Sequence, residues 1–440
     1  MRNNRLRVII TVLFTGMLSL NFICPKGPKT VDPETVGMSK ERLQRVIPVI
    51  EDEIAKEEIP GAVLLVARKG KIVMRRAFGY AEVIPEKKKM KPDMIFDLAS
   101  LTKPMATATS VMILLEQGKL RLLDPVIDFV PNFSRYVYPD STDTTTTQAD
   151  RTTAIPDSIS TIPDSTEAEN ALLYHLLTHT SGYKPYFNAD SLKALYGYPC
   201  VTDTMVKFVA AQEKLNPPGK EFHYSCLGYI TLAKIIKDVS GMNIHQFSQK
   251  YIFEPLKMMH TGYIPQIGEA KPGPNARLMK EAKEKIVPTE VVNGVPFIGT
   301  VHDPLARLQG GISGNAGLFS NVDDMYIFAM MLLNGGQYDG VRILSPLTVK
   351  RMTTIYFRTK DSGRGLGWDL ASPYSSNGGD IFPAGGFGHT GYTGTSLWID
   401  STTKTIVILL TNRVHPYDEG SVVRFRSLVA NVVAGAIIKE

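Results

Sequence analysis

The chain has 440 residues, which is longer than one typical domain and predicts two or three structural units. Hydrophobic residues make up 43% and charged residues 21%, as in an ordinary globular protein with a large core. The formal charge of +6 is small for this length, and no basic run with interleaved aromatic residues occurs, so the composition argues against nucleic-acid binding.

Residues 1–27 have the pattern of an export signal or N-terminal anchor. Three arginines at positions 2, 5 and 7 precede an apolar run over residues 8–24. We therefore expect an exported protein of the periplasm or cell envelope. Cleavage, lipid attachment at Cys24 and retention as an inner- or outer-membrane anchor stay open, because Ile23 stands where lipoprotein signals usually have a small residue and the run is short for a membrane span.

The following segments alternate between helical and β patterns. Residues 39–57 predict a helix that Ser39 caps, and Pro48 inside its apolar stripe predicts a kink or a split. Residues 61–83 predict a β-hairpin with a turn at Lys69 and Gly70.

The middle and the end of the chain continue this alternation. Residues 99–120 predict a helix with an apolar face, and residues 138–170 predict an acidic low-complexity loop because they contain a single basic residue. Residues 227–241 predict another amphipathic helix that Gly241 ends. Residues 395–412 predict two strands, and residues 421–439 predict a last helix.

Strands near both chain ends with helices between them predict an α/β fold of the α+β type. One antiparallel sheet, flanked by helices, would be built from both chain ends, with a mostly helical domain inserted. We place the sheet domain at residues 37–115 and 385–440. The mostly helical domain would then cover residues 116–384 and contain the acidic loop.

The pattern Ser-x-x-Lys occurs three times, at Ser100, Ser181 and Ser401. Only Ser100 is predicted to open a helix, since Ser181 follows a helix end and Ser401 lies in a turn between strands. The positive end of a helix dipole favours a serine alkoxide, and Lys103 lies on the same helix face three residues later. Ser100 is therefore the candidate nucleophile and Lys103 its activating base; the alternative is a helix cap with a solvated lysine.

Two further motifs agree with a hydrolase site. Tyr224 follows a Pro-Gly turn just before a predicted helix, and His389, Thr390 and Gly391 precede a predicted strand. A serine at a helix start, a tyrosine from the helical unit and a basic-Thr-Gly strand edge would form the walls of a serine hydrolase cleft.

These motifs resemble those of the class C β-lactamase and penicillin-binding protein superfamily of serine hydrolases. The resemblance begins near Gly37, continues to the C-terminus except for the acidic loop, and is carried by "ASLTKPMATA", "HLLTHTSGY" and "GHTGYTGTSLWID". The stretch "GTVHDPLARLQGGISGNAGLFS" is similar to the narrower subgroup of penicillin-binding protein 4B. The resemblance implies a β-lactamase/transpeptidase-like fold and a D-Ala-D-Ala carboxypeptidase or related peptidase that acts on cell-wall peptides.

The resemblance also implies a role for each motif residue. Ser100 would be the acylated nucleophile, Lys103 its activating partner, and Tyr224 the general base or its proton-sharing partner. The backbone N–H groups of Ser100 and Tyr392 would form the oxyanion hole, and Gly391 would let the strand edge approach the substrate closely.

Two positions depart from the commonest pattern of the superfamily. Cys226 stands where many members have Asn, and a thiol is a weak donor and acceptor, so recognition of a substrate amide should be weakened. His389 replaces a lysine that many β-lactamases have. Because a histidine is largely neutral at pH 7, we expect weaker carboxylate binding. Activity on carboxylate-bearing substrates should then fall as pH rises through the pKa of His389.

No metal or cofactor is predicted. His175 and His179 have no acid between them as in the zinc-protease motif, and we expect both to pack or to form hydrogen bonds. Cys200 and Cys226 could pair in an oxidising compartment or stay as free thiols. We expect His302 and Asp303 to be structural or at the cleft rim and Trp368 to be in the core, and Asn315 has no predicted role.

The same site leaves several functions open. An esterase and a class C-type β-lactamase would use the same residues as a carboxypeptidase, with a peptide, ester or β-lactam as substrate. The alternative from a different class is a non-catalytic binder or sensor of cell-wall peptides. Cys226 keeps that alternative open, whereas Ser100, Lys103 and Tyr224 argue against it.

Overall fold

The computed structural model describes residues 29–137, 168–266, 283–360 and 362–439. The predicted export segment with Cys24, and residues 138–167 of the predicted acidic loop, lie outside these ranges. Within them, no helix combines the length and the apolar character that crossing a membrane requires.

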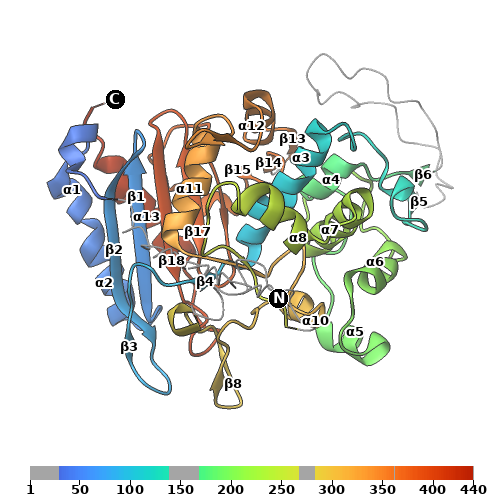
Figure 1. The fold of residues 1–440 in the computed structure, drawn as a ribbon, viewed down its shortest axis with the longest axis horizontal. Helices are drawn as coiled ribbons and strands as arrows, with labels where there is room; N and C mark the ends of the chain where they lie inside the picture. Colours follow the sequence, from blue (N-terminus) through green and yellow to red (C-terminus); the bar gives the residue numbers. More distant parts are fainter. Residues whose placement is uncertain (1–28, 138–167, 267–282, 361, 440) are drawn as a thin grey trace, which may run out of the picture.

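An antiparallel sheet of nine strands occupies one half of the molecule (Figure 1), with the strand order β13-β14-β15-β16-β17-β18-β1-β2-β3. Strands β1 (Gly61–Arg68) and β2 (Lys71–Glu82) come from the N-terminal part, and β17 (Ser396–Asp400) and β18 (Thr405–Thr411) from the C-terminal part. β1 pairs directly with β18. The predicted antiparallel sheet built from both chain ends is therefore confirmed.

The outer strands of this sheet are short. They are β3 (Lys88–Lys89), β13 (Phe357–Thr359), β14 (Ser362–Arg364), β15 (Asp369–Ala371) and β16 (Phe387–Thr390). Strands β13, β14 and β15 fall within residues 116–384, which were predicted to be mostly helical. Strands of three residues are too short to show a period-2 pattern, so their sequence does not reveal them. The division of the chain into two domains stays a prediction.

Both faces of the central strands are buried. In β1, Val63 and Leu65 face one hydrophobic core, and Leu64 and Val66 face another, as the alternation of side chains along a strand requires. Helices α2 (Val46–Ala55) and α13 (Val423–Gly435) cover one face, while α11 (Val322–Leu333) packs on β1 and β18 from the other. The apolar sequence of β1 follows from this two-sided burial.

The predicted local signals at the N-terminal end of the described chain are confirmed. The Ser39 hydroxyl accepts a hydrogen bond from the Arg42 N–H at 3.3 Å and caps α1 (Lys40–Gln44). The helix is interrupted before α2, because the ring of Pro48 clashes with the carbonyl of the residue four positions earlier. Lys69 and Gly70 have φ angles of 50° and 74°, which suit a tight hairpin turn.

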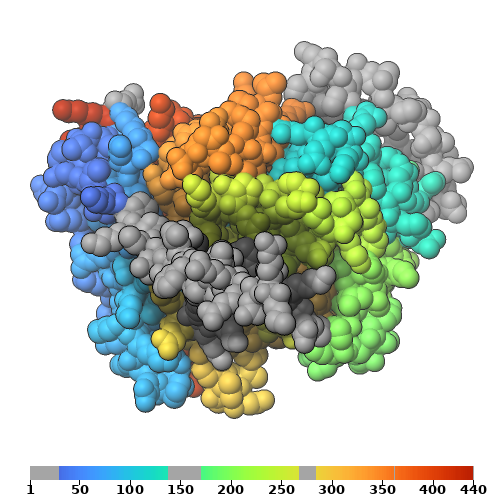
Figure 2. All heavy atoms as spheres, in the orientation of Figure 1, coloured from blue at the N-terminus to red at the C-terminus, as the bar shows by residue number. Residues whose placement is uncertain are grey.

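The other half of the molecule is mainly helical (Figure 1). Its helices are α3 (Thr109–Glu116), α4 (Leu173–Thr178), α5 (Ala189–Tyr196), α6 (Thr202–Ala210), α7 (Cys226–Ser240), α8 (Ile244–Ser248), α10 (Pro304–Leu308) and α12 (Pro346–Met352). Helix α7 ends at Gly241 in the left-handed conformation, as predicted. In Figure 2, atoms of the α11 segment (orange), the α3 segment (cyan) and the α8 segment (yellow-green) adjoin one another on the visible face.

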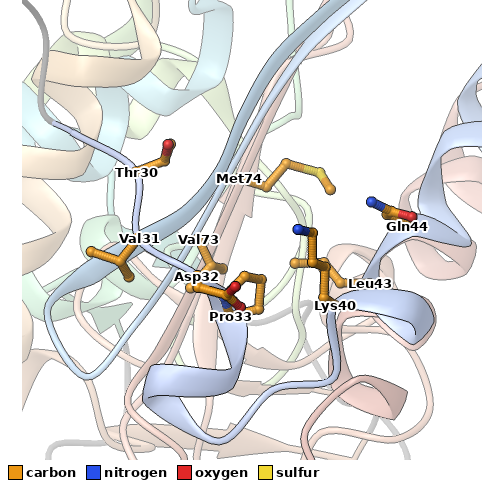
Figure 3. A pocket seen from close by; sticks show the side chains of 9 residues that line it. All are labelled: Thr30, Val31, Asp32, Pro33, Lys40, Leu43, Gln44, Val73 and Met74. Carbon is orange, nitrogen blue, oxygen red and sulfur yellow. The ribbon is translucent and has the colours of Figure 1, made fainter.

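A surface cavity of about 380 Å³ lies on the sheet side of the molecule (Figure 3). Residues 30–33, helix α1 and the β2 residues Val73 and Met74 line it. The Asp32 carboxylate caps a short helical turn there by accepting from the Glu34 N–H at 3.1 Å. None of the motif residues predicted for catalysis lines this cavity.

The packing of the central strands predicts their contribution to stability. Leu65 in β1 is fully buried, so Leu65→Ala should lower the free energy of unfolding by about 2–5 kcal/mol, because it leaves a cavity. Leu347 is 79% exposed, and Leu347→Ala should change it by less than about 0.5 kcal/mol. Denaturant unfolding measures both, and equal losses would contradict the assignment of Leu65 to the core.

Candidate active site

Ser100 lies in a 3-10 turn (Ala99–Leu101), which a π-helical segment (Lys103–Ala108) and then α3 follow. The helical stretch thus begins where it was predicted, but the prediction of one regular helix is wrong. Ala99 has a φ of +45°, a left-handed conformation that is strained for a residue other than glycine. The Asp97 carboxylate accepts a hydrogen bond from the Ala99 N–H at 2.8 Å and so supports this turn.

Lys103 is fully buried beside Ser100. Its amine donates to the Ser100 hydroxyl at 2.8 Å and to the Asn315 carbonyl at 3.0 Å. The spacing of three residues therefore places the amine within hydrogen-bond distance of the serine, as expected. Asn315, which had no predicted role, positions Lys103 through its backbone carbonyl.

Tyr224 lies two residues before α7 and faces Lys103, whose amine is 5.0 Å from the centre of the tyrosine ring. His179 stacks on the tyrosine ring, with 4.3 Å between ring centroids. The His179 ring accepts from the Ser225 N–H at 3.0 Å, and its carbonyl accepts from the His223 N–H at 2.9 Å. His179 thus holds the residues on both sides of Tyr224.

The protonation states of Lys103 and Tyr224 depend on each other. Burial acts to lower the pKa of the Lys103 ammonium, but the Cys226 and Tyr224 side chains raise it, and the net shift is upward. Desolvation raises the pKa of the Tyr224 phenol against the opposing effect of the Lys103 charge. Both groups therefore hold their protons at neutral pH and behave as one coupled unit.

Cys226 is the first residue of α7 and half-buried. Its backbone N–H donates to the Pro185 carbonyl at 3.0 Å. Burial raises the pKa of its thiol, and the Lys103 and Asn315 side chains oppose this shift without reversing it. Cys200 and Cys226 are both free thiols, so the alternative of a disulfide between them is wrong.

The loop after β16 packs directly on the segment that precedes Ser100. The Thr393 hydroxyl donates to the Asp97 carbonyl at 2.7 Å, and the Thr395 hydroxyl donates to the Leu98 carbonyl at 3.1 Å. A Cβ atom at Gly391 would lie 2.4 Å from the Leu98 carbonyl oxygen. Gly391 is therefore required for the approach of the loop to the serine-bearing segment.

Two arginines hold the backbone of this loop. The buried Arg426 guanidinium, from α13, donates to the carbonyls of Gly391 at 2.7 Å and Thr395 at 2.9 Å. Arg413 donates to the Tyr392 carbonyl at 3.0 Å. Within the described residues, the backbone N–H groups of Ser100 and Tyr392 donate to no protein acceptor, so both are free for a ligand.

His389 is buried, and its Nδ1 donates to the Thr390 carbonyl at 2.8 Å. Burial, followed by the Arg364 and Lys103 charges, lowers the pKa of His389 well below its usual range. This shift favours the neutral form of the ring, and the predicted dependence of activity on a His389 titration stays a prediction. The uncharged ring faces Tyr224, with 6.1 Å between ring centroids.

Two further residues discussed in the sequence analysis are in the protein interior. His175 and Trp368 are buried, Trp368 in the main core, as expected. In the described part of the chain, no group of His, Cys, Asp and Glu side chains is arranged to hold a metal ion.

Comparison with known proteins shows the family of this chain. A model of the Beta-lactamase family matches residues 46–431, and the chain belongs to that family of serine hydrolases. It is 28% identical over 427 residues to an "N-acetylmuramyl-L-alanine amidase" of Bacillus subtilis (strain 168), covering 92% of this chain and 90% of that one. It is 29% identical over 425 residues to a "Putative D-alanyl-D-alanine carboxypeptidase" of Escherichia coli (strain K12), covering 92% and 91%.

Solved structures share the fold. EstCE1, described as a hydrolase with promiscuous acyltransferase activity, has a TM-score of 0.66 and 21% identity over 90% of this chain and 99% of that one. An octameric penicillin-binding protein homologue from Pyrococcus abyssi has a TM-score of 0.64 and 22% identity over 89% and 77%. A family VIII carboxylesterase has a TM-score of 0.62 and 18% identity over 91% and 99%. These structures agree with the predicted fold, and the family model confirms the predicted superfamily.

The contact of Gly391 with Leu98 can be tested by adding one methyl group. Gly391→Ala should lower the free energy of unfolding by about 1–3 kcal/mol, because the Cβ has no space. At Gly435, the last residue of α13, an added Cβ would meet no atom of another element within 4 Å, so Gly435→Ala should be neutral or stabilising by up to about 1 kcal/mol. Thermal and denaturant unfolding compare the two, and a neutral Gly391→Ala would refute the close contact.

Proposed function

We propose that this protein forms an acyl-enzyme on Ser100. The observation that carries the proposal is the hydrogen bond of 2.8 Å between the fully buried Lys103 amine and the Ser100 hydroxyl. A serine hydroxyl needs an adjacent base before it can attack a carbonyl, and Lys103 with Tyr224 can supply one after the pair loses a proton. The strained turn at Ala99 holds the hydroxyl in place for that attack.

Tyr224 and Lys103 would share the proton transfers of the reaction. The unit takes the Ser100 proton during attack, passes a proton to the leaving group, and later activates the water that releases the acyl group. Stacking on His179 fixes the tyrosine ring. His389 is neutral, so with Thr390 and Gly391 it would contact the substrate as a wall of the cleft and not as a fixed charge.

The backbone N–H groups of Ser100 and Tyr392 would bind the oxyanion of the tetrahedral intermediate. Such donors lower the barrier because they are oriented before the charge develops. Arg426 supports this proposal, because its guanidinium bonds the carbonyl of the peptide unit whose N–H belongs to Tyr392. A charge-assisted bond to that carbonyl polarises the peptide and strengthens its N–H as a donor.

As substrate we propose a cell-wall peptide, with the protein exported to the envelope and acting as a D-Ala-D-Ala carboxypeptidase or related peptidase. The names of the Bacillus subtilis and Escherichia coli relatives support this class, and the N-terminal pattern supports export. An esterase is the second candidate, because the Cys226 thiol offers a substrate amide a weaker partner than an asparagine does. A β-lactamase or a non-catalytic binder of cell-wall peptides would not turn over the peptide.

Three substrates separate these functions. We expect release of D-alanine from a peptide ending in D-Ala-D-Ala, slower hydrolysis of a short acyl ester, and little turnover of a chromogenic β-lactam. Ser100→Ala should abolish all three activities, and Ser181→Ala, which removes another Ser-x-x-Lys serine, should retain them. Turnover that survives in Ser100→Ala would refute the proposed nucleophile.

The pH dependence of the rate tests the coupled base. The pKa values of Lys103 and Tyr224 are both shifted upward, so the deprotonated unit becomes more populated as pH rises. The kcat/KM for an ester should therefore increase from pH 6 to pH 9. Titration of His179 or His389 should not add a further change in this range, because the pKa values of both are lowered. A kcat/KM that falls over this range would contradict the assignment, and Tyr224→Phe should flatten the increase.

A further inference from the structure

We propose that Asp303 forms a subsite for an ammonium group on the acyl half of the substrate. The inference rests on the proposed function, since it names which acyl groups the Ser100 site prefers. The candidate ligand chemistry is a peptide with a free amine near the scissile bond, such as the side chain of a diamino acid or an unblocked N-terminus.

Backbone contacts place Asp303 close to the nucleophile. The Asp97 carboxylate accepts from the Ala99 N–H at 2.8 Å through one oxygen and from the His302 N–H at 2.7 Å through the other. Ala99 precedes Ser100, and His302 precedes Asp303. One fully buried carboxylate therefore fixes the segment of Asp303 against the segment of Ser100.

Further contacts link the segment of Asp303 to the segments of Tyr392 and Cys226. On one side, the His302 ring stacks on the Tyr392 ring with 5.7 Å between centroids. On the other side, the Tyr186 hydroxyl donates to the Asp303 carboxylate at 3.4 Å, and the preceding Pro185 carbonyl accepts from the Cys226 N–H. The segment of Asp303 thus contacts Tyr392 through His302 and adjoins Cys226 through Tyr186 and Pro185.

The Asp303 carboxylate has capacity for a cationic ligand. It is half-buried, and one oxygen caps α10 by accepting from the Ala306 N–H at 2.8 Å. The other oxygen has only the long contact with Tyr186, and no Lys, Arg or His in the described part of the chain forms an ion pair with it. Burial has the largest effect and lowers the pKa of Lys103 but raises that of Cys226, and the Asp303 charge raises the pKa of both groups.

Electrostatics decides which half of the substrate would meet Asp303. A carboxypeptidase substrate carries a carboxylate on its leaving group, and Asp303 would repel it. The buried Arg364 is already paired with the buried Asp369 carboxylate, so the repulsion from Asp303 sets the orientation. The leaving group would therefore lie away from Asp303, and the acyl half would pass it.

A matched pair of peptides tests the subsite. Nα-acetyl-Lys-D-Ala-D-Ala has a free side-chain amine, and its Nε-acetyl derivative lacks the charge. The wild-type kcat/KM should favour the amine by about tenfold, the size expected for one partly desolvated charge pair. The ratio should approach one in Asp303→Asn, which keeps the cap of α10, and should fall at high salt.

Two controls separate this inference from other effects. Glu290→Gln removes the carboxylate 3.6 Å from the His302 ring and should keep the amine preference. Acylation by ampicillin and benzylpenicillin, which differ by one ammonium group, should show the same preference when competed against a fluorescent penicillin. Turnover without an amine preference, or a preference unchanged in Asp303→Asn, would overturn the subsite alone. Neither turnover nor acylation would contradict the proposed function and the subsite together.

Discussion

Two threonine hydroxyls in the loop after β16 connect the two ends of the chain at the site. Thr393 and Thr395 donate to the carbonyls of Asp97 and Leu98, and Gly391 makes this approach sterically possible. The sheet pairing of β1 with β18 brings the two ends of the chain together, and these contacts fix the strand edge beside the serine turn. This packing brings the segment of Tyr392 and the segment of Ser100 together.

The electrostatics of the cleft combine buried cations with neutral histidines. Burial, followed by the charges of the buried Arg364 and Lys103, lowers the pKa values of His179 and His389 well below their usual range. A neutral His179 can accept from the Ser225 N–H and stack on Tyr224, which a protonated ring would do less well. The Arg364 guanidinium is paired with the buried Asp369, whereas the Asp303 carboxylate has no ion-pair partner among the described residues.

The sequence predicted the parts of the site that depend on local spacing. Ser100 and Lys103 are three residues apart on one helical stretch, so their contact follows from helix geometry. The supporting residues Asp97, Arg426 and Ala99 were not predicted. Arg426 bonds residues distant in sequence, and an alanine gives no signal of the left-handed conformation that Ala99 adopts. The sheet could be predicted from the apolar run of β1, whereas three-residue strands such as β14 leave no periodic signal.

The central claim is that Ser100 becomes covalently acylated, and intact-protein mass spectrometry tests it most directly. After incubation with benzylpenicillin, the protein should gain the mass of one penicilloyl group, and peptide mapping should locate it on the peptide that contains Ser100. Lys103→Ala should greatly slow the gain, because the serine loses its buried hydrogen-bond partner. An adduct on another residue, or an adduct that persists in Ser100→Ala, would contradict the account.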